Sequence, residues 1–280
     1  MDLNKVIELK GRSAGPSSMI IVGVHGDERC GYEALEKLLP TLKIDNGLVF
    51  MAYGNPPAIK NNQRFYEANL NRLFKDNELL NEAEKNSYEY SRAQFLKNYL
   101  NQVEALLDVH ASFVPASRRF IICEPNAQEI TDYLPFDLVV SGFDAIEPGG
   151  TDYYMNKINK IGICVECGPL NDPASTEVAA QSIISFLKVR GHISGRDLVI
   201  KEQDKIQMTS LYLSKTNSFK LSQPFKDFTE LKSGELIGLD GGEEIRTEKD
   251  CIILFATSLG KSGEEAFLLG EYKKGPASAR

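Results

Sequence analysis

Residues 18–28 read SMIIVGVHGDE, a short apolar run that stops at a polar turn containing glycine. The run predicts a buried strand, and the helical spacing of Leu35, Leu38 and Leu39 after the turn predicts a helix. Similar apolar runs along the rest of the chain predict strands over residues 47–53, 105–110, 119–123, 138–142 and 160–166. Helical segments lie between several of these strands. This alternation predicts an α/β fold whose mixed, mostly parallel central sheet carries helices on both faces.

Two segments carry strong helix signals. Residues 78–101 combine apolar spacing with strong helix formers, and they predict one long helix. Residues 171–191 predict another helix, whose N-cap is Asn171 or Asp172, followed by a proline at the first helical position. Residues 61–74 are polar but interrupted by aromatic and apolar side chains, and they predict an ordered loop.

The pattern of the sequence changes after residue 192. Short β-branched or aromatic runs are separated there by Gly, Asp and Lys turns, which predicts a small C-terminal all-β domain. We therefore predict an α/β domain over residues 1–192, which contains the candidate functional residues, and a β-rich domain over residues 193–280.

The composition is that of an ordinary globular protein. The chain has 280 residues with 32 Lys+Arg against 39 Asp+Glu, a formal net charge of −7. This acidic balance argues against nucleic acid or an anionic membrane as a partner. No apolar stretch approaches the roughly 20 residues of a membrane span, and no secretory signal is visible at the N-terminus, so we expect a cytoplasmic protein with reduced cysteines. The assembly state stays open, a homo-oligomer included.

Three residues form a candidate metal site. His25 and Glu28 lie three positions apart where the first strand turns into a helix, a spacing that lets an imidazole and a carboxylate converge on one ion. His110 ends another predicted strand, and sites in α/β proteins are built at strand ends. Two His and one Glu leave a coordination position of Zn²⁺ open for water. The same residues also fit a helix cap, a solvated acid and a packed strand end.

Four further residues are candidates for chemistry or binding. Glu166 ends a predicted strand directly before CGP, so its carboxylate emerges at a sheet edge, either as an inert cap or as a general base. Arg64, Asn71 and Arg72 lie in one polar segment after GNPP. They are either surface residues or a fixed anion-binding surface, because the planar fork of Arg suits a carboxylate.

Five motifs in this order carry a resemblance to a known family: VGVHGDE (22–28), GNPPA (54–58), RFYEANLNRLF (64–74), LLDVHAS (106–112) and GICVECGP (162–169). They resemble the succinylglutamate desuccinylase and aspartoacylase family of zinc-dependent amidohydrolases, which is related to M14 carboxypeptidases. The resemblance implies a zinc carboxypeptidase-like fold, one Zn²⁺ per chain, and hydrolysis of the amide bond of an N-acylated amino acid or a related small amide.

The resemblance also implies roles for the residues of the candidate metal site. His25, Glu28 and His110 match the zinc ligands of the family, and Glu166 matches its general base. Zn²⁺ would lower the pKa of bound water toward ~7, and Glu166 would take the proton as this water attacks the amide carbonyl. Glu166 would then pass that proton to the leaving amine.

Arginines of the polar segment match residues that handle the substrate. Arg64 matches the arginine that polarises the scissile carbonyl and shares the oxyanion charge with the metal. Asn71 and Arg72 match the pair that holds the α-carboxylate of the substrate. Aspartoacylases carry another arginine, for a second carboxylate, where this chain has Asn156, so N-acetylaspartate is doubtful as the substrate. Arg118 or Arg119 would replace that contact, or they would lie in solvent.

The remaining alternatives concern single residues and other classes of protein. Asp108 could accept the second N–H of His110, or it could be an ordinary buried or capping Asp. Cys164 and Cys167 form a CxxC motif, but residues three apart on a strand face opposite sides, which favours small buried side chains over a thiol site. His192 follows a helix end and is expected at the surface. The alternatives to a hydrolase are a non-catalytic or carboxypeptidase-like zinc-binding protein of the same fold, and a thiol-based redox protein.

Overall fold

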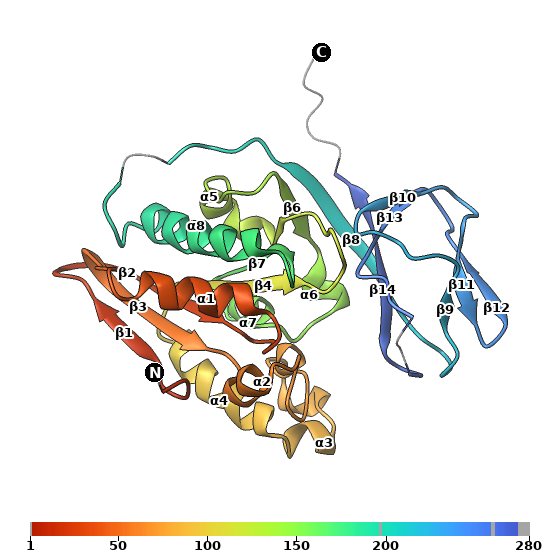
Figure 1. Ribbon diagram of the computed structural model, residues 1–280, viewed down its shortest axis with the longest axis horizontal. Helices are drawn as coiled ribbons and strands as arrows, with labels where there is room; N and C mark the ends of the chain where they lie inside the picture. Colours follow the sequence, from red (N-terminus) through yellow and green to blue (C-terminus); the bar gives the residue numbers. More distant parts are fainter. Residues whose placement is uncertain (1, 196–197, 259–260, 274–280) are drawn as a thin grey trace, which may run out of the picture.

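A sheet of eleven strands runs through most of the protein, and a second sheet of three strands lies in its C-terminal part (Figure 1). The structure is a computed structural model that describes residues 2–195, 198–258 and 261–273. Residues 274–280, which end the predicted C-terminal domain, lie outside the described residues.

The six strands predicted before residue 170 correspond closely to β2 to β7 of the structure. The strands are β1 (Ile7–Lys10), β2 (Ser13–Val22), β3 (Asn46–Tyr53), β4 (Ala105–Ser112), β5 (Phe120–Cys123), β6 (Leu138–Ser141), β7 (Ile161–Pro169), β8 (Asp204–Leu213), β9 (Lys220–Leu221), β10 (Thr229–Leu231), β11 (Leu236–Asp240), β12 (Glu243–Arg246), β13 (Cys251–Leu254) and β14 (Glu265–Tyr272). The helices are α1 (Arg29–Leu38), α2 (Pro56–Asn61), α3 (Glu82–Lys85), α4 (Tyr88–Leu100), α5 (Gln128–Thr131), α6 (Phe143–Ile146), α7 (Thr151–Lys157) and α8 (Pro173–Val189), with the 3-10 turns η1 (Leu70–Arg72), η2 (Asn77–Leu79) and η3 (Pro125–Ala127).

The centre of the large sheet is parallel. Its order is β1-β3-β2-β4-β7-β5-β6-β8-β14-β13-β10. β3, β2, β4 and β7 are parallel neighbours, whereas β5 runs antiparallel to β7. Because β2, β4 and β7 are parallel, their carboxyl ends lie at one edge of the sheet, where ligand sites of α/β proteins form. The predicted mixed α/β architecture is confirmed.

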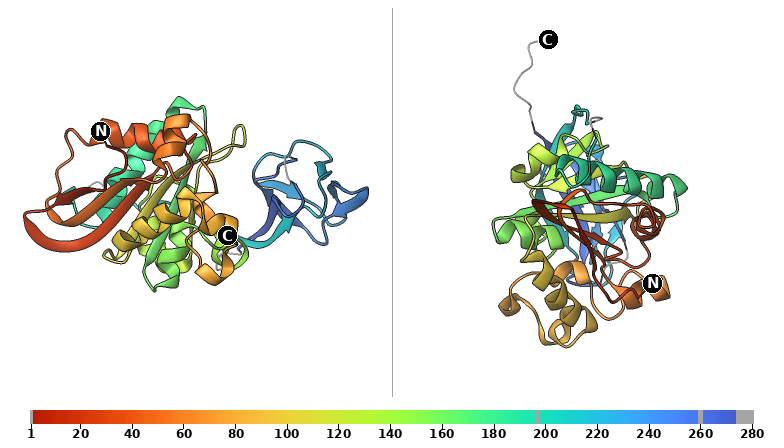
Figure 2. Two further views of the ribbon diagram at one scale, coloured as in Figure 1. Left: turned by 90° about the horizontal axis from the view of Figure 1, so that it is seen from below. Right: turned by 90° about the vertical axis from the view of Figure 1, so that its left-hand side faces the viewer.

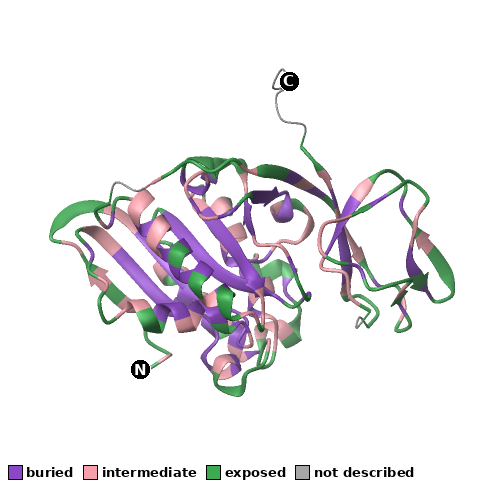
Figure 3. Cartoon of the chain, turned by 45° about the horizontal axis from the view of Figure 1, so that its top comes forward, coloured by how far each residue is buried: buried purple, intermediate pink, exposed green. Residues whose placement is uncertain are grey.

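Helices cover both faces of the sheet, as predicted. Ile20 and Val22 of β2 belong to the core cluster that includes residues of α1 and α8. Met19 and Ile21, which point to the other face, pack in the cluster of α4 and α7. A fully buried side chain of this size contributes about 1.5–3 kcal/mol to stability, so strands that are buried on both faces dominate the core. Figure 3 shows these strands buried between helices whose outer faces are exposed.

The long strand β8 joins the C-terminal strands to the central sheet. Its first residues pair in parallel with β6, from Leu138↔Asp204 to Ser141↔Gln207, and the strand also pairs antiparallel with β14. The large sheet therefore includes strands from both sides of residue 192, and among the described strands β9, β11 and β12 form a separate small sheet. Figure 2 shows the C-terminal strands to one side of the helical part. The division into domains 1–192 and 193–280 stays a prediction.

The prediction of one long helix over residues 78–101 is wrong. The structure has η2, α3 and α4 there, with a break at Asn86 and Ser87. Asn81 caps α3 in a capping box, and the hydroxyl of Ser87 accepts the N–H of Tyr90 at the start of α4. Asn and Ser side chains compete for backbone N–H groups in this way, so they favour helix ends over a continuous helix.

The helix predicted over residues 171–191 is α8, and Asp172 is its N-cap. The carboxylate of Asp172 accepts the N–H of Ala174 at 2.9 Å, and Pro173 occupies the first helical position. None of the helices that the structure describes is long and apolar enough to cross a membrane.

The prediction that His192 lies at the surface is wrong, because the residue is 0% exposed. Its Nε2 lies 2.8 Å from the hydroxyl of Ser18, and its Nδ1 lies 3.0 Å from the backbone oxygen of Asn46. The imidazole thus ties the end of α8 to the middle of β2 and the beginning of β3. A polar residue just beyond a helix gives no sign of such a distant partner.

Ser87→Ala is expected to lower the free energy of unfolding by about 1 kcal/mol, the usual cost of a lost N-cap. Urea unfolding followed by circular dichroism measures the change. Ser91→Ala, at an exposed position inside the same helix, is the matched control and should change stability by less than about 0.5 kcal/mol. Equal losses in the two variants would contradict a cap at Ser87.

Candidate metal centre

The turn after β2 places His25 and Glu28 against α2. Gly26 makes this approach possible, because a Cβ atom there would lie 2.1 Å from the carbonyl carbon of Ala58. The N–H of Gly26 donates to the backbone oxygen of Arg64 at 3.2 Å, so the turn also fixes the start of the polar loop. Glu28 then stands at the N-cap position of α1. The glycine of HGDE is therefore needed for close backbone packing.

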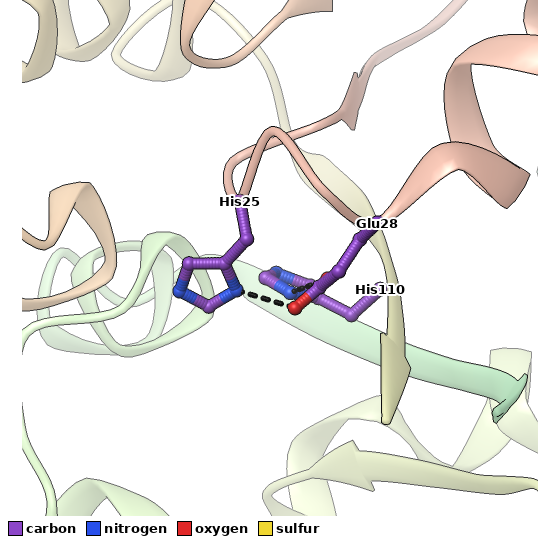
Figure 4. Close-up of side chains that lie close together, drawn as sticks. All are labelled: His25, Glu28 and His110. Carbon is purple, nitrogen blue, oxygen red and sulfur yellow. Dashed lines mark hydrogen bonds and ion pairs between the residues drawn. The ribbon is translucent and has the colours of Figure 1, made fainter. Parts of the chain in front are cut away.

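The structure brings His25, Glu28 and His110 together. Glu28 lies between the two imidazoles: Oε1 is 2.6 Å from Nδ1 of His25, and Oε2 is 2.8 Å from Nδ1 of His110 (Figure 4). One ligand atom from each residue lies within 4.8 Å of the others, and each residue is 2% exposed. Two imidazole nitrogens and one carboxylate oxygen form a buried group that could hold a metal ion.

The outer partners of the two imidazoles suit a metal site. His25 Nε2 lies 3.1 Å from Oδ1 of Asn69. His110 Nε2 lies 3.2 Å from Oδ2 of Asp108, although the orientation does not meet hydrogen-bond geometry. A proton on each Nε2, next to these oxygens, leaves both Nδ1 lone pairs facing Glu28. Burial lowers the pKa of His25 to about 4, so its ring is neutral at neutral pH. Burial opposes the charge of His110 as well, but Asp108 and Glu28 outweigh it and raise the pKa of His110 well above its usual value, so metal binding there would release a proton. The donor set fits Zn²⁺.

Glu166 lies beside this cluster. It is opposite His110 in the parallel register of β4 and β7, and it is 7% exposed. Its Oε2 has no hydrogen-bond partner among the described residues. Burial, and then the nearby Glu28 carboxylate, raise the pKa of Glu166 to about 8. A buried carboxyl group with a free oxygen is suited to accept and return a proton.

A cavity of about 510 Å³ opens at the cluster, a size that suits a small-molecule ligand. It is lined by the three residues of the cluster and by Glu166. Apolar side chains form part of its wall, and further polar residues come from the loop before α3, from α7 and from the C-terminal strands. The charged and polar residues of its lining outside the cluster include Arg64, Asn71, Arg72, Asp144, Glu147, Asp152, Glu264 and Glu265.

Arg64 reaches the cluster from the polar loop. Its Nη1 donates to Oε1 of Glu28 at 3.1 Å, and its guanidinium carbon lies 5.8 Å from the ring centre of Phe113. The side chain is 37% exposed, so it stands at the boundary between the buried cluster and the open cavity.

Arg72 also lines the cavity, but its guanidinium is already bound by two carboxylates. Nε and Nη2 donate to the two oxygens of Glu265 at 2.7 and 2.8 Å, and Nη2 also pairs with Glu147. Burial opposes ionisation of Glu265, but Arg72 outweighs it and lowers the pKa of Glu265 to about 2. Asn71, the neighbour of Arg72, lines the same cavity.

The structure does not bring Arg118 to the cavity. Its Nη2 lies 3.2 Å from Asp204, the first residue of β8, and 3.3 Å from Asp137, which directly precedes β6. β6 and β8 are neighbouring strands. The adjacent Arg119 pairs with Asp172 instead. Asn156, which the resemblance matches to an arginine of aspartoacylases, donates to Asp144 at 3.0 Å and is not among the described residues that line the cavity. Interstrand ion pairs hold Arg118, and this accounts for its place away from the site.

Sequence reasoning missed Glu89, which orders the polar loop. Glu89 is 0% exposed, and its carboxylate accepts the backbone N–H groups of Tyr66, Glu67 and Ala68. It also accepts from the side-chain amide of Asn55 at 3.0 Å. One signal was available: Glu89 lies on the face of α4 that buries its apolar residues, where an acid requires partners.

The two cysteines of the CxxC motif lie on opposite faces of β7, as predicted. Cys164 packs in the cluster with Phe120, whereas Cys167 packs in the cluster of α1 and α8. Both are buried free thiols, and burial raises their pKa well above the usual value. They form no joint thiol site.

The chain is similar to known proteins in both sequence and fold. The succinylglutamate desuccinylase/aspartoacylase catalytic-domain family matches residues 14–190. The chain is similar to the succinylglutamate desuccinylase of Shewanella denitrificans, with 26% identity over 271 residues that cover 86% of this chain and 77% of that protein. A probable aspartoacylase of Trichodesmium erythraeum is 23% identical over 253 residues, 79% of this chain and 76% of that protein. The fold matches the crystal structure of succinylglutamate desuccinylase from Vibrio cholerae with a TM-score of 0.81 at 18% identity, over 97% of this chain and 87% of that chain.

Glu89→Ala is expected to lower the free energy of unfolding by about 3 kcal/mol or more, because several buried N–H groups lose their acceptor at about 1–3 kcal/mol each. Hydrogen exchange over residues 61–74 should accelerate in the same variant. Glu89→Gln keeps one acceptor oxygen and should lose less. Glu82→Ala, an exposed acid on α3, is the control. Unchanged exchange in Glu89→Ala would contradict this role.

Proposed function

Because this chain belongs to the succinylglutamate desuccinylase/aspartoacylase family, we propose that it is a zinc-dependent hydrolase that cleaves the amide bond of an N-acylated amino acid or a related small amide. One observation carries the proposal: a buried His25–Glu28–His110 cluster and the unpaired carboxylate of Glu166 face the same cavity. We propose one metal ion per chain.

His25, Glu28 and His110 would hold the metal. A bound Zn²⁺ supplies Lewis acidity toward water and toward a carbonyl oxygen. Asn69 and Asp108 would fix the orientation of the two imidazoles from outside, and the backbone N–H of Ala111 donates to Glu28 at 3.1 Å and holds its carboxylate in place. The burial of the cluster excludes bulk water from the ligand atoms.

Glu166 would act as the general base and then as the general acid. Its free Oε2 would take a proton as water attacks the amide carbon, and it would return that proton to the nitrogen of the leaving amine. A pKa raised by burial supports both steps, because it keeps proton affinity high without a permanent partner for the carboxylate. Well-placed groups of this kind typically contribute about 10²–10⁴-fold in rate.

Arg64 would stabilise the charge that develops on the carbonyl oxygen. Its guanidinium contacts Glu28 at the edge of the cluster, so a carbonyl oxygen bound there would lie within its reach. Asn71 and Arg72 would form the wall against which the amine half of the substrate lies. Arg118 lies away from the cavity, so we propose no role for it in substrate binding.

Glu166→Gln is expected to retain about one zinc per chain and to lose at least about 10²-fold in turnover. Zinc is measured by elemental analysis, and amine release is measured over N-acetyl, N-succinyl and longer N-acyl substrates with zinc supplied. His110→Ala should lose both metal and activity. Cys164→Ala removes a thiol from the same cavity and should remain active, which separates this mechanism from thiol chemistry. Full activity of Glu166→Gln, or wild-type protein without zinc affinity, would refute the proposal.

A further inference from the structure

The carboxylate position beside Arg72 is filled by the chain itself. Glu265 accepts two nearly parallel hydrogen bonds from Nε and Nη2 of Arg72, at 2.7 and 2.8 Å. This is the bidentate arrangement in which an arginine binds the carboxylate of a ligand. Nη2 also pairs with Glu147, and Nη1 donates to the backbone oxygen of Asn71 at 2.9 Å. Four of the five N–H groups of the guanidinium therefore have an acceptor within the chain. No second pair of N–H groups is left to bind a substrate carboxylate through both of its oxygens.

Both carboxylates come from backbone that is held in place. Glu265 is the first residue of β14, which pairs with β8 on one side and with β13 on the other. Glu147 follows α6 in a segment that packs on the backbone of Arg72: a Cβ atom on Gly149 would lie 2.7 Å from the backbone oxygen of Arg72. The N–H of Phe74 donates to the oxygen of Gly149 at 3.0 Å in the same place. The pairing is thus built into the fold.

The cavity also contains more acids than arginines. Apart from the metal-ligand carboxylate and the proposed general base, its described lining includes Asp144, Glu147, Asp152, Glu264 and Glu265. Arg64 is engaged at the metal cluster and Arg72 is shared by two carboxylates. Burial raises the pKa of Asp152 to about 7 and that of Asp144 to about 6, which agrees with a shortage of positive charge in this part of the wall. Buried carboxylates in such surroundings attract a cationic ligand group.

We propose that the amide cleaved by this protein is an N-acylated amine whose leaving half carries a protonated amino group and no carboxylate. The inference rests on the proposed function and narrows its substrate class. Glu265 takes the position that an α-carboxylate would need, and the surplus carboxylates around Arg72 receive the ammonium group. The apolar wall, which includes Phe143 and Phe267, accommodates the methylene chain between the two nitrogens.

Four acetyl amides of equal chain length separate the effects of the two charges. N-acetyl-1,4-diaminobutane carries the cation alone, Nα-acetylnorvaline carries the carboxylate alone, Nα-acetylornithine carries both, and N-butylacetamide carries neither. For the zinc-loaded wild type, we expect kcat/KM to be highest for the diamine amide. Its advantage over N-butylacetamide should be at least about tenfold, the usual effect of one charged hydrogen bond. Each added carboxylate should lower kcat/KM.

Glu265→Gln should reverse this order. Without the Glu265 charge, Arg72 can receive a ligand carboxylate, so Nα-acetylnorvaline should gain and the diamine amide should lose at least about tenfold each. Glu271→Gln is the matched control, because Glu271 lies on the same strand but pairs with Lys249 outside the cavity. It should leave the order of the four substrates unchanged.

Binding of the free amines gives a second readout that does not depend on turnover. In titration calorimetry with Glu166→Gln loaded with zinc, 1,4-diaminobutane should bind more tightly than butylamine and norvaline. A preference for norvaline, or an unchanged order in Glu265→Gln, would overturn the inference while leaving the proposed hydrolase intact. If no N-acyl substrate is cleaved at all, the hydrolase proposal fails, and the calorimetric order still decides the charge preference.

Discussion

The parallel register of β2, β4 and β7 is the constraint on which the site depends. Pairing of β4 with β7 puts His110 directly opposite Glu166, and pairing of β2 with β4 brings the turn with His25 and Glu28 to the same edge. A shift of one residue along β4 would turn His110 into the other face of the sheet. The two helical layers hold that register, because side chains of β2, β3 and β4 are buried on both faces.

The C-terminal strands give this centre its surroundings. The cluster and Glu166 come from residues before β8, but part of the cavity wall comes from the turn before β14 and from β14 itself. Since β8 pairs with both β6 and β14, the wall is fixed to the same sheet that carries the cluster. The proposed bond cleavage and the proposed charge selection would thus belong to different parts of one continuous sheet.

Local patterns in the sequence were sufficient for the strands before residue 170, whereas the residues of the candidate metal cluster were indicated only by these patterns together with the order of the five motifs. HGDE indicates a turn, and LLDVHAS indicates a buried strand with a histidine near its end. The partners of Arg72 could not be read in this way, because Glu265 lies 193 residues away and joins it only through sheet pairing. The burial of His192 could not be predicted either, because its partners Ser18 and Asn46 are also distant in the sequence. The helix break at Ser87 has a different cause. Ser87 is a common N-cap residue, but the many helix formers around it favoured the prediction of one continuous helix.

The order of the elements along the chain has a consequence for biosynthesis. His25, Glu28, His110 and Glu166 all precede β14 in the chain, so they are translated before it. Domains tend to fold as they leave the ribosome, from the N-terminal side onward. The candidate ligand residues can therefore leave the ribosome and begin to pack before the strand that bears Glu265 has emerged.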